Sequence, residues 1–280
     1  MLNVIFAILI FLLFVVRPFV YKKSAKLLTP NTSTIFTAFW SVIVSIISLP
    51  ILLKATPIDF SLNFGALASI LKGFCIYEII KNTQILNKES TSASVAWGPI
   101  ALAISATFNF MFLGEILTGK QFFIIFALFF IGFSYFFICE YKHLTNKARI
   151  AFLITLLVVT INIISDRAAL NKISWYMHLL ICYISMICFS FCFGIKKEDI
   201  VSCIKLKSTW TAGIIYALGE IVVIMAMQKI FNNVSVCIFL IRVAQAVDLI
   251  IAYHIYKEGK IGFQYMFAVL QIIVVYFFFF

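Results

Sequence analysis

The stretch FNFMFLGEILTGKQFFIIF, residues 108–126, decides how the rest of this sequence is divided. Two apolar runs flank a short segment rich in glycine, charged and polar residues: Gly114, Glu115, Thr118, Gly119, Lys120 and Gln121. Such a break between apolar runs is typical of a turn that joins two helices. We expect this turn to lie at a membrane surface, where water solvates Glu115 and Lys120.

The composition of the whole chain indicates a membrane protein. Of its 280 residues, 64% are hydrophobic and 12% are charged, and its mean hydropathy is +1.10. Soluble domains are about half apolar and about a quarter charged. An α-helix needs about 20 mainly apolar residues to cross a bilayer, and such runs fill nearly the whole sequence. The sequence therefore predicts an all-α polytopic membrane protein, whose first apolar run is a retained helix rather than a cleaved signal peptide.

Apolar windows separated by polar breaks predict ten transmembrane helices. The expected ranges are 2–21, 32–53, 63–83, 91–113, 121–139, 149–168, 174–193, 209–229, 234–256 and 262–279. The polar connection EYKHLTNKAR, residues 140–149, lies close to the middle of the chain. It divides the protein into two units, residues 1–143 and residues 144–280.

An internal repeat relates these two units. When the sequence is shifted by 143 residues, LGEILTGKQFF (113–123) falls on YKEGKIGFQYM (256–266), so that Glu115 meets Glu258 and Gln121 meets Gln264. Each segment stands just before the last apolar helix of its unit. Because duplicated units are common in transporters, the pattern predicts two repeats of five helices each.

The repeated order of helix, short turn, helix, then "LGE.LT..Q" and a last helix resembles EamA-type members of the drug/metabolite transporter superfamily. The resemblance covers essentially the full length and includes SDRAALNKIS, residues 165–174. It implies a carrier of ten helices that moves a small solute by alternating access, with a bacterial inner membrane as its location. The chain departs from the family pattern where Leu102 replaces a frequent proline, and where Arg242 stands at the counterpart of Pro99.

The basic residues give the chain a net charge of +11, and most of them lie between the apolar runs. Positive charge retains loops in the cytoplasm, so no nucleic-acid partner is expected. Lys and Arg are concentrated in the odd-numbered connections, which places both termini outside the cell. The family resemblance implies the opposite orientation, with both termini inside.

Charges inside the predicted spans are candidate functional groups. A charged side chain at the bilayer centre costs about 2.5–3.5 kcal/mol on insertion scales, so each one calls for a reason. Five residues qualify: Lys72, Glu78, Glu220, Arg242 and Asp248. Glu220 and Arg242 lie on consecutive spans and are expected to approach each other, either as a packing ion pair or as a solute site. Glu78 and Lys81 share a helix face and are expected to satisfy each other.

The predicted substrate-binding residues combine these charges with neighbouring polar and aromatic side chains. They are Lys72, Tyr77, Glu78, Trp97, Glu220, Arg242 and Gln245. Arginine and lysine facing a cavity suit a carboxylate or a phosphate of a solute. For Trp97 the alternative is an anchor at the membrane interface.

These patterns predict a secondary transporter of a small polar metabolite, of the amino-acid or organic-anion class, with proton coupling through Glu78 or Glu220. Two alternatives stay open: a membrane-embedded enzyme acting on lipid-linked substrates, and a non-transporting membrane subunit. The aspartates are scattered and no phosphate-binding loop is present in the sequence, so we expect no enzyme activity, no cofactor and no metal site. Beyond the solute and the lipid bilayer no partner is required; a monomer is sufficient and a dimer is compatible.

Overall fold

The computed structural model describes residues 2–25, 29–52, 63–90, 93–194, 201, 207–231, 234–257 and 261–279. Within these ranges the chain is helical and contains no strand. The helices are α1 (Leu2–Ala25), α2 (Pro30–Leu52), α3 (Phe64–Glu89), α4 (Ala93–Phe112), α5 (Gly119–Tyr135), α6 (Asn146–Leu170), α7 (Trp175–Cys192), α9 (Lys207–Met225), α10 (Val234–Tyr256) and α11 (Ile261–Phe279). Two π-helical turns, η1 (Phe136–Glu140) and η2 (Ala226–Ile230), extend α5 and α9.

A helix therefore occupies each of the ten ranges expected from the sequence. Among the described residues, five segments are long and apolar enough to cross a membrane: Gly119–Glu140, Asn146–Leu170, Trp175–Cys192, Trp210–Ile230 and Cys237–Ile255. Shorter apolar stretches occur in α1, α2, α4 and α11. Large apolar side chains such as Phe123 and Ile47 are exposed, as expected for a surface that contacts lipid. The fold is that of an all-α integral membrane protein.

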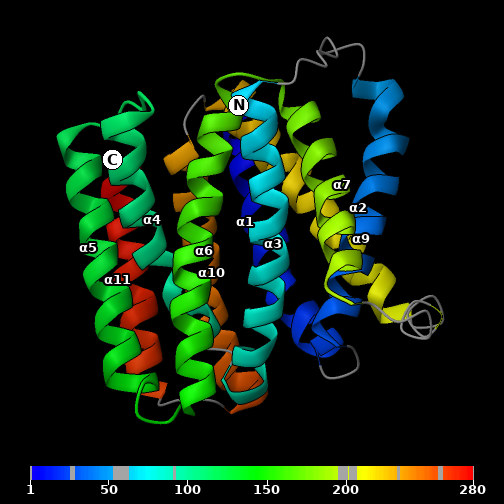
Figure 1. Ribbon diagram of the computed structural model, residues 1–280. Coiled ribbons are helices and arrows are strands. Elements are labelled where there is room, and N and C mark those ends of the chain that lie inside the picture. The colour runs from blue at the N-terminus through cyan, green and yellow to red at the C-terminus, as the bar shows by residue number, and fades with distance from the viewer. Residues whose placement is uncertain are drawn as a thin grey trace.

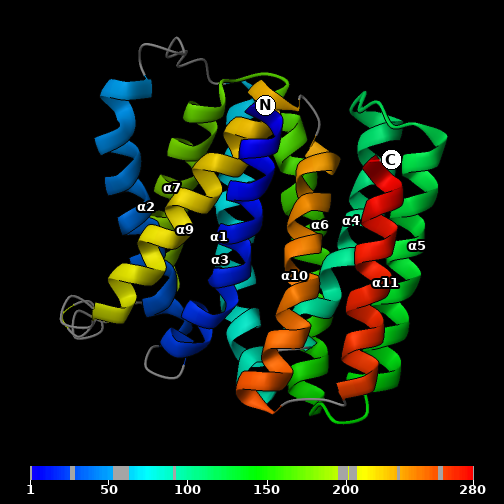
Figure 2. The ribbon, with the colours of Figure 1, turned by 180° about the vertical axis from the view of Figure 1, so that it is seen from behind.

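The helices form a bundle in which the two halves of the sequence are interleaved (Figures 1 and 2). Helices α4, α5 and α11 pack together on one side, and α2, α7 and α9 pack together on the other. Between them lie α1, α3, α6 and α10, with α3 in extensive contact with α6. Helix α1 begins and α11 ends toward the same end of the bundle. The predicted boundary at residues 143 and 144 falls in the short connection between η1 and α6.

The turn at residues 113–118 ends α4 and starts α5. Gly114 has φ of +64°, a left-handed conformation that glycine adopts without steric penalty. Thr118 then caps α5: its hydroxyl accepts the backbone N–H of Gln121, and the Gln121 side chain accepts the N–H of Thr118. This reciprocal pair satisfies N–H groups that the helix itself leaves without partners. The glycine and the polar residues of this segment thus have a local structural purpose.

Glu115 departs from expectation. Lys120 is exposed as predicted, but Glu115 is only 2% exposed and is not solvated. Its two carboxylate oxygens accept the backbone N–H and the hydroxyl of Ser235, each at 2.7 Å. Ser235 lies in the first turn of α10, where N–H groups lack helical partners and the helix dipole favours an anion. Glu115 therefore ties the α4–α5 turn to the start of α10 in the other half of the chain.

Glycine allows two pairs of helices to approach closely. A Cβ atom on Gly73 of α3 would lie 2.6 Å from the Cys182 carbonyl oxygen of α7. A Cβ atom on Gly213 of α9 would lie 2.6 Å from the Cβ of Trp40 in α2. Small residues at such contacts let backbones pack closely where no hydrophobic effect drives the helices together.

We expect Gly73→Ala to lower the free energy of unfolding by about 1–3 kcal/mol, because the added methyl group meets a backbone atom that cannot move aside easily. Thermal denaturation of the purified protein in detergent measures the effect. Gly119→Ala is the control, since a Cβ atom there meets nothing within 4 Å. Equal melting temperatures for the two variants would contradict the proposed close contact.

Candidate functional site

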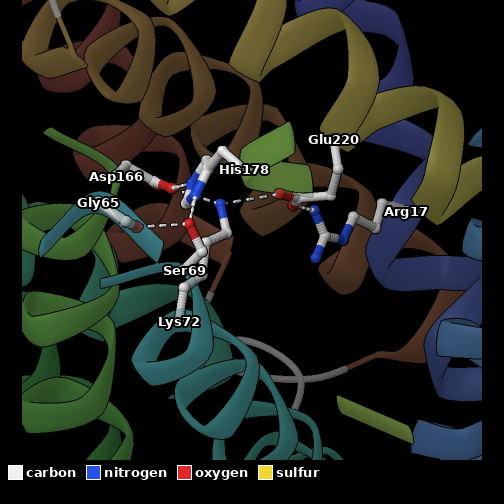
Figure 3. A network of polar contacts seen from close by, with 7 residues as sticks. All are labelled: Arg17, Gly65, Ser69, Lys72, Asp166, His178 and Glu220. Atoms are coloured by element: carbon white, nitrogen blue, oxygen red, sulfur yellow. Dashed lines mark hydrogen bonds and ion pairs between the residues drawn. The ribbon is translucent and has the colours of Figure 1, made fainter. Parts of the chain in front are cut away.

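Five polar side chains from five helices converge in the interior of the bundle (Figure 3). They are Arg17 of α1, Lys72 of α3, Asp166 of α6, His178 of α7 and Glu220 of α9. We call this set the charge cluster. It joins the two halves of the sequence, because Arg17 and Lys72 come from the first half and the other three come from the second.

Lys72 lies at the centre of the charge cluster and is 1% exposed. Its ammonium group donates to Asp166 Oδ1 at 2.5 Å, and Glu220 Oε2 lies 3.5 Å away. Asp166, which is 2% exposed, also contacts His178 Nε2 at 2.8 Å through the same Oδ1 atom. A buried cation is tolerated in such surroundings only when carboxylates surround it, and here two do.

Glu220 connects this buried core to Arg17. The guanidinium of Arg17 donates through Nη1 to Glu220 Oε1 at 3.0 Å, while the other Glu220 oxygen faces Lys72. Aromatic rings hold the guanidinium in place: its Cζ lies 5.0 Å from the ring centroid of Phe14 and 4.3 Å from that of Tyr216. Stacking on aromatic faces suits the delocalised arginine charge and fixes its direction.

A cavity of about 150 Å³ lies beside the charge cluster. Arg17, Asp166 and Glu220 form its charged wall, and most of the remaining lining is aliphatic or aromatic. The lining comes from α1, α3, α4, α6, α9, η2 and α10, so both halves of the chain contribute. A mainly apolar pocket with a few convergent polar groups is the usual form of a small-molecule site.

Several neutral polar groups that line this cavity have no hydrogen-bond partner in the part of the chain that the structure describes. They are the Thr83 hydroxyl, both amide atoms of Gln84, and the amide oxygens of Asn87 and Asn162. Gln84 is 1% exposed and Asn87 is 5% exposed, so bulk water does not solvate them freely. Buried polar groups are nearly always hydrogen-bonded, so this cluster requires a bound water or ligand. We call these four residues the amide wall.

Three of the predicted site residues belong to this region. Lys72 is central to the charge cluster, and Glu220 belongs to both the cluster and the cavity lining. Trp97 lines the cavity and is 8% exposed, which places its ring in the interior. Trp97 is thus a buried residue of the cavity lining.

Tyr77 and Glu78 lie elsewhere on α3. Tyr77 is buried and stacks on Phe193, with 5.2 Å between ring centroids. Glu78 contacts Lys81 at 3.1 Å and also accepts the side-chain amide of Asn82, so the expected local pair is present. Neither residue lines the cavity.

Arg242, Gln245 and Asp248 all belong to α10. The side chains of Arg242 and Gln245 lie outside the described part of the structure. Asp248 is 1% exposed, and neither of its carboxylate oxygens has a hydrogen-bond partner among the described residues. In the structure Glu220 pairs with Lys72, and also with Arg17, a partner that was not expected from the sequence.

Sequence reasoning missed Arg17, Asp166 and His178. Of the three, Arg17 was the easiest to identify from the sequence, because VVRPFV (15–20) places an arginine inside the first apolar run. Asp166 lies near the end of its predicted span, where a charged residue does not by itself indicate a functional site. His178 was evident as an interior position of α7, but nothing in its local sequence indicates a carboxylate partner on another helix. Their convergence depends on packing between α1, α3, α6, α7 and α9.

Comparison with known proteins adds no assignment to this geometry. No known protein-family model matches the sequence, and no curated protein matches it. The charge cluster and the cavity are therefore the features of this protein from which its function can be inferred.

We expect Lys72→Met and Asp166→Asn each to lower the free energy of unfolding by about 3–5 kcal/mol, because each variant leaves a buried charge with an incomplete set of partners. The double variant Lys72→Met/Asp166→Asn is expected to lose much less than the sum of the two single losses. Chemical denaturation in detergent measures all three.

The matched control is Lys81→Met, which removes the half-exposed pair with Glu78. It is expected to change the free energy of unfolding by at most about 1 kcal/mol, as exposed pairs do. Additive losses for Lys72→Met and Asp166→Asn would show that the two side chains do not act as a pair.

Proposed function

We propose that this protein is a secondary transporter that carries a small polar metabolite across the membrane by alternating access. The observation that carries the proposal is the amide wall beside the charge cluster: buried hydrogen-bonding groups facing a cavity, without partners in the described chain. A solute that fills the cavity supplies those partners.

The energetics of the amide wall favour a binding site over a purely structural interior. Leaving a buried donor or acceptor without a partner costs about 1–3 kcal/mol per group. A protein that only needed a stable bundle would gain by replacing Gln84 or Asn162 with an apolar residue. Retaining them around one cavity is reasonable when they bind something that comes and goes, a solute or the water that replaces it.

The arrangement of the cavity supports the ten-helix, two-repeat architecture that we propose for the transporter. Two pairs of lining residues are related by the same shift of 143 residues that aligns residues 113–123 with residues 256–266 in the sequence. They are Ile80 with Val223, and Gln84 with Met227. In inverted or duplicated carriers the solute site lies where the repeats meet, and rocking of one repeat against the other exposes it alternately. The resemblance to EamA-type carriers extends the proposal to a bacterial inner membrane.

The chemistry of the lining suggests the solute class. Arg17 suits a carboxylate, Glu220 suits a cationic amino group, and the amide wall suits neutral donors and acceptors. Aliphatic and aromatic side chains cover the rest, which favours a solute with an apolar portion. We therefore propose an amino acid or a small organic anion.

Counterflow in proteoliposomes tests the proposal. Vesicles preloaded with a panel of unlabelled amino acids and carboxylates are diluted into trace labelled solute, and accumulation above protein-free vesicles is expected for at least one compound. Folded protein that shows no accumulation with any member of the panel, but binds partner proteins or modifies lipid-linked substrates, would replace this proposal with one of the two alternatives.

Gln84→Met separates binding from stability. We expect it to weaken the apparent affinity for the solute about 10-fold, because the solute loses a hydrogen bond, and to leave the melting temperature unchanged or higher, because a buried group without a protein partner is removed. Thr155→Val is the control: Thr155 is buried, and among the described residues its hydroxyl bonds only to Ala151 O in its own helix. A Gln84→Met protein that loses stability while transport persists would assign the amide a structural role.

A further inference from the structure

We propose that His178 binds a proton and that this proton is coupled to a carboxylate bound at Arg17, so that the cavity takes an organic anion together with a proton. The inference rests on the proposed transport function for its physiological meaning. Its physical basis is the hydrogen-bond pattern around His178, which accommodates two charge states of the imidazole in one geometry.

The hydroxyl of Ser69 allows His178 to adopt both charge states. Its Oγ lies 2.7 Å from His178 Nδ1 and 2.8 Å from the carbonyl oxygen of Gly65, yet a hydroxyl has a single proton to donate. With neutral His178, Nε2–H donates to Asp166 and the Ser69 hydroxyl donates to Nδ1. With protonated His178, both ring nitrogens donate, and the Ser69 hydroxyl turns to the Gly65 carbonyl while accepting Nδ1–H. Figure 3 shows the contacts of the Ser69 oxygen with His178 and with Gly65. Rotation of the single hydroxyl hydrogen between these two partners is enough to satisfy both states.

The contacts of Asp166 link this proton to the rest of the charge cluster. Lys72 Nζ and His178 Nε2 both contact the same oxygen, Asp166 Oδ1. When His178 becomes a cation, two positive groups share that atom. Lys72 is then drawn toward its second partner, Glu220 Oε2, which lies 3.5 Å from its Nζ in the structure. Glu220 then interacts more strongly with Lys72 and less strongly with Arg17, whose side chain lines the cavity.

Charge balance identifies the ligand. Arg17 and Lys72 carry two positive charges, and Asp166 and Glu220 carry two negative charges, so these four charges sum to zero when His178 is neutral. A proton taken from water by Nδ1 leaves one positive charge in a buried site. A carboxylate bound to the guanidinium of Arg17 restores neutrality, and arginine binds carboxylates in a bidentate manner. Proton and anion thus favour each other's binding.

The groups that face His178 are accounted for on each packed helix. Helix α3 contributes Ser69 and Lys72, α6 contributes Asp166, and α9 contributes Glu220. Helix α2, which also packs on α7, contains no ionisable side chain, and on α7 itself the ionisable residues nearest in sequence are Tyr176 and Cys182. Asp166 is therefore the carboxylate in direct contact with the imidazole, within the described residues.

Nuclear magnetic resonance of the imidazole tests the proposal without requiring transport. In a His143→Gln/His254→Gln protein with labelled histidine, His178 is the sole histidine, and ring nitrogen shifts distinguish the neutral ring from the imidazolium. Both replaced histidines are exposed. In lipid nanodiscs we expect reversible conversion of His178 from the neutral ring to the imidazolium as the pH is lowered stepwise over the range in which the protein stays folded.

Butyrate, with butyramide as the uncharged match, probes the coupling. Butyrate is expected to raise the imidazolium fraction at a fixed pH at least 2-fold, butyramide to leave it unchanged, and Arg17→Gln to abolish the effect of butyrate. A His178 ring that keeps one protonation state over the whole range, or that responds equally to both probes, would overturn the inference.

Transport of a counterflow-positive carboxylate supplies the second readout. His178→Gln keeps a side-chain amide that can donate to Asp166 but cannot carry a proton. We expect it to retain counterflow and to lose at least 10-fold of the accumulation driven by a pH gradient, while His254→Gln behaves as wild type. Undiminished gradient-driven accumulation in His178→Gln refutes the coupling but leaves the transport proposal intact. Absence of all counterflow refutes transport. In that case the magnetic resonance result alone decides whether His178 binds the proton.

Discussion

The interior of this protein is organised around a single buried cation. Lys72 is almost completely removed from solvent, and removing an ammonium group from water is strongly unfavourable unless anions compensate it. Asp166 and Glu220 provide that compensation from α6 and α9, and each is in turn held by a further partner, His178 or Arg17. Five helices are therefore constrained to meet at one point, whatever the lipid-facing side chains do.

This constraint also explains why the cavity lies where it does. Charges that pair across helices require those helices to face one another, and the close contact at Gly73 brings α3 and α7 near enough for Ser69 to reach His178. On the adjoining side, side chains of α1, α3, α6 and α9 line the cavity, and the amide wall forms part of that lining. The same helices thus bear a tightly packed polar cluster on one side and an incompletely satisfied polar surface on the other.

The candidate site was only partly predictable from residue types. A charge within an apolar run is conspicuous, and this logic selected Lys72 and Glu220, which do meet in the structure. The same logic also selected Glu78, whose carboxylate forms an ion pair with Lys81 one turn away on the same helix. The logic fails for Asp166 and His178, because a residue near a helix end, or a single histidine among thiols, becomes significant only through its neighbours on other helices. The amide wall was missed because uncharged polar residues are tolerated in many packed helices.

Hydrophobic content and the spacing of polar breaks by themselves determined the helical character of the chain, the ranges of its helices and the turn at Gly114 to Gln121, since these depend on local chemistry and on the lack of backbone partners in lipid. Tertiary structure alone decided which charges pair, that Glu115 caps α10 instead of facing water, and that a cavity opens beside Arg17. The reason is that apolar windows and polar breaks identify which residues form a helix but not which helix each face meets. In a chain with so few charges, partner choice is set by packing across the whole bundle.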